Sequence, residues 1–401
     1  MADSLSTKDT SLKEVIGFPE LLGIGITASM GSGGFNLISE GVKQGGPQFP
    51  AAIAIVAALF QGASKVYSEA YTAFKTNTSE SDVVREEFGP FIQNLTAIAI
   101  SGFGILSIST ILVFAAKTLF PAGKWYGQIS VALLALGTMT SFALKGIEAN
   151  TKVISFFSAV IVALLTFASA IGLIEGFGTG GTPPDAYPPE FASTISLPQS
   201  INYFYFVLAG FESLMKFTEE TSEPDTNIPK SFYMTNAIST LLTVGVAYAY
   251  VHTLTLKKSG GAVGHDALSL IIQTAVGKPA GSAVYWLSIL IMVVTAFIAF
   301  LATSRYIHGM ANEMGIEWLQ ELNAEKVPWK AVVACGGVAG LGILMNHTST
   351  LVNISDTFLT VTLVTVSAAV TAMRWRRGET PWVEGATTLG FLAILSTCCI
   401  P

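Results

Sequence analysis

The chain has 401 residues, of which 51% are hydrophobic and only 12% are charged, and its formal net charge is −6. An ordinary soluble domain carries about a quarter charged residues, so this composition excludes a soluble globular protein and predicts an all-α polytopic membrane protein. The expected partner is therefore the lipid bilayer, and no nucleic acid is expected. Three cysteines, Cys335, Cys398 and Cys399, show no metal-binding spacing and are too few for a disulfide framework.

Apolar segments recur along the whole chain, each near the ~20 residues that a helix needs to cross a bilayer. We predict eleven spans: 17–42, 49–74, 90–119, 125–145, 151–175, 199–219, 232–256, 282–310, 329–346, 350–373 and 383–400. The longer connections are 75–89, 176–198, 257–281 and 311–328, and residues 1–16 form a polar tail. With the N-terminus inside, fifteen of the 21 Lys and Arg residues fall on the cytoplasmic face, so a cytoplasmic N-terminus is predicted.

The first span contains a glycine cluster, Gly31-Ser32-Gly33-Gly34, in the middle of apolar sequence. Irregular backbone at this depth is tolerated only where it is buried or lines a cavity, and interrupted helices form the substrate sites of many secondary transporters. We therefore predict a helix break at Gly31–Gly34. The alternative is that these small residues only allow neighbouring helices to pack closely.

A second interruption is predicted in the sixth span, within Phe206-Val207-Leu208-Ala209-Gly210-Phe211-Glu212. Spans one and six hold the same position in two successive groups of five helices. Because five is odd, the second group enters the membrane from the opposite side, which makes the two repeats inverted. Paired interruptions in corresponding halves indicate a transporter site.

The two predicted breaks offer complementary groups for a zwitterion. The half-helix after Gly34 would present unpaired N–H groups that suit a carboxylate, and the half-helix ending near Val207 would present carbonyls that suit an ammonium group. This arrangement predicts an α-amino acid as the substrate.

At these residues the chain resembles the amino acid–polyamine–organocation superfamily, whose core has ten helices in two inverted five-helix repeats, the leucine-transporter fold. The match is carried by Phe206-Val207-Leu208-Ala209-Gly210-Phe211-Glu212 and by the following Glu219-Glu220 and Ile228-Pro229. Gly31-Ser32-Gly33-Gly34-Phe35 is similar to the family's element in span one. The chain departs from the family pattern where Asn77-Thr78-Ser79-Glu80-Ser81 replaces a proline-and-glycine element, and in having eleven spans instead of twelve.

The resemblance implies roles for individual residues. Phe206 lies where the family has an aromatic gate over the substrate, and Glu212 is expected to be a proton carrier, a charge partner for a cationic substrate, or a helix cap. Thr303 and Ser304 resemble positions that bind Na⁺ in sodium-coupled relatives, with hydroxyl-to-backbone bonds inside the helix as the alternative. Ile161 occupies the position of a lysine found in some proton-coupled members, so coupling to H⁺ or to Na⁺ stays open.

We thus predict a secondary active amino acid transporter in the cell membrane, with a core at 17–377 (repeats about 17–175 and 199–373) and an additional helix within 378–401. Its substrate-binding residues are predicted to be Ser29, Met30, Gly31, Ser32, Gly33, Gly34, Phe206, Val207, Leu208, Ala209 and Gly210. The alternatives are a carrier of polyamines or cationic amino acids and a non-transporting nutrient receptor. No nucleophile–base pair appears within the spans, so no enzyme, cofactor or certain metal site is expected.

Overall fold

The computed structural model describes residues 14–178, 195–256 and 267–398, and these are almost entirely helical. Each of the eleven predicted spans corresponds to a helical segment: α1 (Phe18–Gly45), α2 (Phe49–Phe74), α4 (Pro90–Leu119), α5 (Trp125–Ala143), α6 (Ile147–Gly178), α8 (Leu197–Leu208) with η3 (Phe211–Glu220), α9 (Pro224–Leu256), α11 (Lys278–Met314), α12 (Trp329–Met345), α13 (Thr348–Arg376) and α14 (Trp382–Cys398). The predicted bounds lie within a few residues of these helices, except that α9 begins at Pro224 and not at 232.

Among the described residues, four short helices lie outside the predicted spans: η1 (Gly46–Gln48), α3 (Ser79–Phe88), α10 (Ala267–Val276) and η5 (Glu317–Leu319). Hydropathy did not reveal α3 because its sequence is polar, although Ser79, Glu80 and Ser81 are completely buried. These side chains are buried by neighbouring helices from distant parts of the chain, which a hydropathy pattern does not record.

Seven of the described helical stretches are long and apolar enough to cross a membrane. Their outward faces carry large apolar side chains, such as Leu134 on α5 and Ile174 on α6, which are 71% and 75% exposed. An apolar exterior of this kind suits a bilayer, because in water it would form extended hydrophobic patches.

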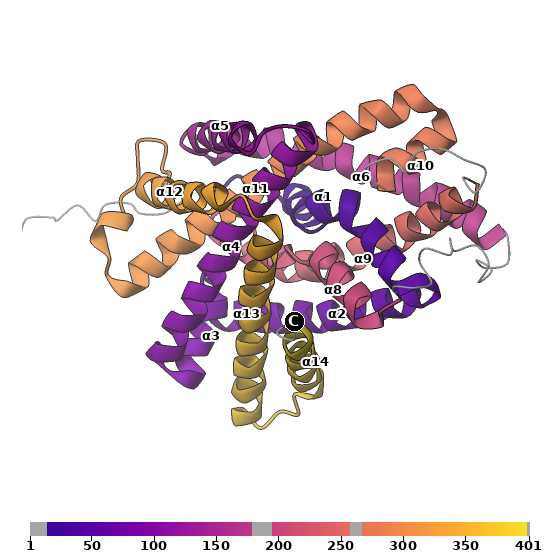
Figure 1. Ribbon diagram of the computed structural model, residues 1–401. Coiled ribbons are helices and arrows are strands. Elements are labelled where there is room, and N and C mark those ends of the chain that lie inside the picture. The colour runs from indigo at the N-terminus through magenta and orange to yellow at the C-terminus, as the bar shows by residue number, and fades with distance from the viewer. Residues whose placement is uncertain (1–13, 179–194, 257–266, 399–401) are drawn as a thin grey trace, which may run out of the picture.

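Helix α1 lies near the centre of the bundle, where it packs against α6, α8, α9 and α11 (Figure 1). Around this centre, α4 packs along α11 and α13, while α6 packs along α9. The last helix, α14, contacts α13 and α2 at the periphery of the bundle.

The predicted break at Gly31–Gly34 is wrong for this structure, because α1 is one continuous helix from Phe18 to Gly45. The glycines instead let other helices approach. A Cβ atom added to Gly31 would lie 1.8 Å from Thr295 Oγ1, and one added to Gly33 would lie 2.9 Å from the Cα of Val207. The alternative interpretation, close packing of small residues, therefore describes the cluster, and this packing offsets the cost of about 1 kcal/mol for each helical glycine.

The break predicted in the sixth span is confirmed. Helix α8 ends at Leu208, Ala209 is extended, and Gly210 has a φ of +116°, after which η3 continues as a 3₁₀-helix. A side chain at Gly210 would meet the backbone of α1, since an added Cβ would lie 2.5 Å from the carbonyl oxygen of Ala28. Glycine is therefore required here both for the backbone angle and for the contact between α1 and the break.

Candidate functional site

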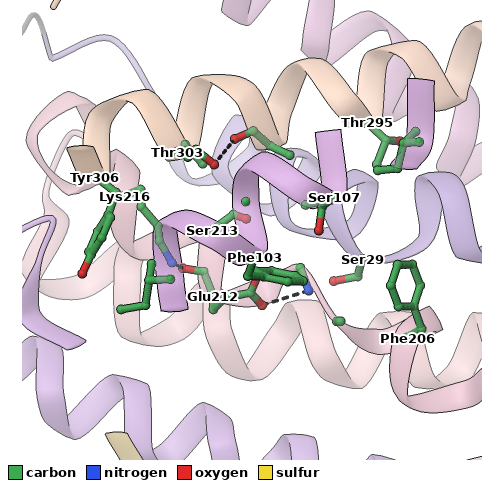
Figure 2. A pocket seen from close by; sticks show the side chains of 18 residues that line it. Ser29, Phe103, Ser107, Phe206, Glu212, Ser213, Lys216, Thr295, Thr303 and Tyr306 are labelled. Carbon is green, nitrogen blue, oxygen red and sulfur yellow. Dashed lines mark hydrogen bonds between the residues drawn. The ribbon is translucent and has the colours of Figure 1, made fainter. Parts of the chain in front are cut away.

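A cavity lies in the centre of the bundle, between α1, α4, α11 and the break that separates α8 from η3. Figure 2 shows Phe206, Ser29 and Thr295 toward one end of the cavity and Lys216 and Tyr306 toward the other. The cavity volume is about 60 Å³. A cavity needs about 10–15 Å³ to hold one water molecule, so this volume admits more than one water or a small part of an organic solute.

The break rearranges the hydrogen bonds of the backbone beside the cavity. In a regular helix the N–H of Gly210 would donate to the carbonyl of Phe206, but here it donates to Oε2 of Glu212 at 2.8 Å. The Glu212 side chain is buried, with the residue only 3% exposed, and it lies in the first turn of η3. Its carboxylate thus holds the break open and leaves the carbonyl of Phe206 without that helical bond.

Among the α1 residues predicted to bind substrate, only Ser29 lines the cavity. Its hydroxyl is buried and has no hydrogen-bond partner within the part of the chain that the structure describes. Met30, Gly31, Gly33 and Gly34 are buried in helix contacts instead, and the side chain of Ser32 lies outside the described residues. Because α1 is helical throughout, its N–H groups are used within the helix, and the predicted amide site for a carboxylate is not formed in this conformation.

The residues predicted in the sixth span divide into two groups. Phe206, Ala209 and Gly210 line the cavity, whereas Val207 and Leu208 are completely buried in the packing around it. The Phe206 ring lies at the end of the cavity opposite Tyr306 (Figure 2). The sequence thus identified the sixth span as a boundary of the cavity. The structure shows which residues of that span line the cavity.

The predicted coupling residues of α11 use their hydroxyls within their own helix. Thr303 lines the cavity and donates to the carbonyl of Ala299 at 2.7 Å, and Ser304 donates to the carbonyl of Leu301 at 2.8 Å. These are the in-helix bonds that the sequence left as the alternative. Within the described ranges, no group of three or more His, Cys, Asp and Glu residues could hold a metal ion. The Na⁺ site at Thr303 and Ser304 stays a prediction.

The predicted site residues do not include Lys216, in the middle of η3. Lys216 lines the cavity although it is only 5% exposed, and its ammonium lies 2.8 Å from the carboxylate of the buried Glu80. The signal available was a lysine one helical turn after Glu212 in an otherwise apolar span. Its partner is 136 positions away in sequence, so no local pattern connects the two.

A second buried ion pair lies farther along η3. Arg305 is completely buried in α11, and its guanidinium contacts both oxygens of Glu220, with Nε and one terminal nitrogen each donating at 3.1 Å. Bidentate contacts of this kind are among the strongest that arginine makes with a carboxylate. The end of η3 is therefore held to α11 while Lys216 holds its middle to α3.

Comparisons with known proteins agree with this architecture. The family model described as amino acid permease matches residues 16–400. The crystal structure of MhsT in complex with L-phenylalanine is similar, with a TM-score of 0.65 and 14% sequence identity, covering 96% of this chain and 99% of that one. No curated protein sequence matches. The structural likeness shows a leucine-transporter-type fold, and the family match over nearly the whole length shows that this multi-pass membrane protein belongs to the amino acid permease family.

Proposed function

We propose that this chain is a secondary active amino acid transporter that works by alternating access, with two inverted repeats of five helices around the cavity. The observation that carries the proposal is the cavity at the break between α8 and η3. There the N–H of Gly210 bonds to Glu212, which leaves the carbonyl of Phe206 free of its helical bond beside a lining of apolar and hydroxyl-bearing side chains. Membership of the amino acid permease family supports the class of solute. The similar MhsT structure contains L-phenylalanine, which supports an amino acid substrate as well.

We place the substrate between Ser29 and Phe206. The carbonyl of Phe206 accepts from the ammonium group, and the unpartnered hydroxyl of Ser29 donates to the carboxylate. The Phe206 ring then closes one end of the cavity. A cavity of about 60 Å³ favours a small neutral amino acid in this conformation. Further donors from the region of Ser32–Gly34 would require α1 to unwind in another state of the transport cycle.

A cationic amino acid or polyamine is the second candidate, favoured by the Glu212 carboxylate in the cavity lining. Lys216 forms its ion pair with Glu80, so its charge is shared between Glu80 and Glu212 and compensates Glu212 only in part. The compensating charge then comes from a cationic substrate or from a bound proton, and a proton on Glu212 would couple transport to H⁺. We place the N-terminus and α3 on the cytoplasmic side of the cell membrane, by the distribution of Lys and Arg.

Uptake by purified protein in proteoliposomes tests the function. We expect labelled small neutral amino acids to accumulate saturably, and more so under an inward H⁺ or Na⁺ gradient than without one. Labelled lysine and putrescine in the same vesicles test the cationic candidate, and protein-free liposomes give the background. Saturable binding with neither uptake nor exchange would refute the transporter and indicate a receptor.

Ser29→Ala tests the position of the substrate. This change removes one hydroxyl and adds no bulk, so we expect weaker binding, by roughly fivefold to twentyfold for one lost hydrogen bond, with unchanged stability. Ser130→Ala is the matched control, because Ser130 lies on the exposed face of α5 and its hydroxyl bonds only within its own helix. Equal affinities in the two variants would contradict the proposed pose.

A further inference from the structure

Helix α3 buries polar groups against the inner half of the bundle. Glu80 and Ser81, in its first turn, are completely buried. Ser81 shares a hydrogen bond with the hydroxyl of Tyr306 on α11, and Glu80 forms an ion pair with Lys216 on η3. These two residues belong to the segment that replaces the family's proline-and-glycine element, so the departure from the family pattern supplies new contacts at this end of the cavity.

The ammonium of Lys216 lies between the cavity and α3. It is 2.8 Å from Oε1 of Glu80, donates to the backbone carbonyl of Glu212 at 3.0 Å, and lies 5.8 Å from the centre of the Tyr306 ring. The two paired side chains are 6% and 0% exposed. Lys216 and Tyr306 form the end of the cavity opposite Phe206, as Figure 2 shows.

We propose that the Glu80–Lys216 ion pair is the latch that closes the cavity on the side of α3. The proposal rests on the proposed transport function, because only a carrier needs this end of its cavity to open and close. A solute leaving on this side must pass Lys216 and Tyr306, which requires η3 to separate from α3 and the ion pair to break.

The local backbone allows η3 to move as a unit. It is joined to α8 through Ala209 and Gly210, which are both outside helical geometry, and the N–H of Gly210 is bonded to Glu212 within the η3 side of the break. Because both partners are buried, separating them exposes two charges to a poorly solvating environment unless water enters. The pair therefore biases the protein toward closure, and water that enters the open state stabilises the separated charges.

Accessibility of a single cysteine in the cavity tests the latch. The reporter is Ala302→Cys, a lining position on α11, in a chain in which Cys335, Cys398 and Cys399 are replaced by alanine. A membrane-impermeant thiol reagent is applied from each side separately, in vesicles of known orientation. The test variant combines Glu80→Gln with Lys216→Met, which removes the ion pair and leaves no isolated buried charge.

We expect the double variant to raise the labelling rate from the α3 side by roughly tenfold or more, because the closed state loses the ion pair that favours it. The control is Lys75→Met, which breaks the exposed Lys75–Asp225 pair on the same side, and which should leave the rate unchanged. A rate in the double variant within twofold of the parent would overturn the proposal.

A swapped pair, Glu80→Lys with Lys216→Glu, separates a latch from a merely structural contact. Opposite charges are restored, so slow labelling should return, and fast labelling in this variant would also overturn the proposal. If the double variant does not purify as a single species, Glu80→Gln alone takes its place and should also label faster than the parent. Labelling needs no substrate, so failure of the latch leaves the uptake result standing, and failure of uptake leaves the labelling result readable.

Discussion

Replacement of Gly210 by alanine tests whether the break beside α1 is required. The residue has a φ of +116°, outside the regions that L-residues occupy readily, and such backbone strain costs about 1–3 kcal/mol. The new Cβ would also lie 2.5 Å from the carbonyl oxygen of Ala28 and 2.9 Å from the nitrogen of Ser29. Both contacts are with backbone, so α1 itself must shift.

The cost of Gly210→Ala is the sum of the backbone strain and the contact with α1. Forcing a methyl group into a packed contact costs about 1–3 kcal/mol, so the total for Gly210→Ala is about 2–6 kcal/mol. Even the lower value corresponds to a roughly 30-fold change in an equilibrium constant. Because the contact borders the cavity, we expect the loss to appear in substrate affinity, in resistance to unfolding, or in both.

The assay compares Gly210→Ala with Gly137→Ala in detergent-purified protein. An added Cβ at Gly137 on α5 meets no atom within 4 Å, so alanine there should be neutral or stabilise the helix by about 0.5–1 kcal/mol. Binding of a labelled amino acid and the midpoint of unfolding are measured for both proteins. The reasoning is refuted if the two variants match the parent equally well.

Three further predictions concern other parts of the molecule. Burial and the neighbouring Glu313 carboxylate raise the pKa of Asp82 on α3 to about 7, above its unfolded value, so the folded protein binds the proton more tightly. The stability of the protein should therefore fall as pH rises from about 4 through 7. Asp82→Asn should flatten the plot of melting temperature against pH over this range. Arg305→Met leaves Glu220 buried without its partner and should destabilise the protein by about 3–5 kcal/mol in chemical unfolding, with part of the loss recovered by adding Glu220→Gln. Gly33→Val should abolish substrate binding while membrane insertion stays intact, because its Cβ would meet the backbone of α8 at 2.9 Å; normal uptake would contradict the close contact of α1 with α8.

Hydropathy and length located the spans because every helix that crosses a bilayer needs about 20 predominantly apolar residues, whichever helices it packs against. The break at Ala209–Gly210 was also predictable, since a glycine followed by Glu212 within an apolar span suits both a left-handed backbone and a capping carboxylate. In this case the residue that stabilises the break lies two positions from it. Local sequence therefore contained the necessary information.

The glycine cluster of α1 shows why the other predicted break failed. A run of glycines fits either an interruption or a close helix crossing, and the choice depends on what lies opposite. Here the opposing groups are Thr295 on α11 and Val207 on α8, both remote in sequence. The α4 residues of the cavity, among them Phe103 and Ser107, were missed for a related reason, because nothing in an ordinary apolar helix marks the face that meets a cavity.

The difference between α1 and the α8–η3 segment has a mechanical consequence. A continuous helix in the centre of a bundle, packed on several sides, resists local movement because its backbone bonds and its close glycine contacts must break together. The segment beyond Gly210 is less constrained along the chain, since the last regular helical bond of α8 is the one from Ala209 to Tyr205 and the N–H of Gly210 bonds to Glu212 instead. In this conformation the ion pairs of Lys216 and Arg305 tie η3 to α3 and α11, in addition to the packing of its buried apolar side chains such as Phe211. Control of opening on the α3 side should therefore reside in these side-chain charges, while α1 serves as the wall against which the cavity closes.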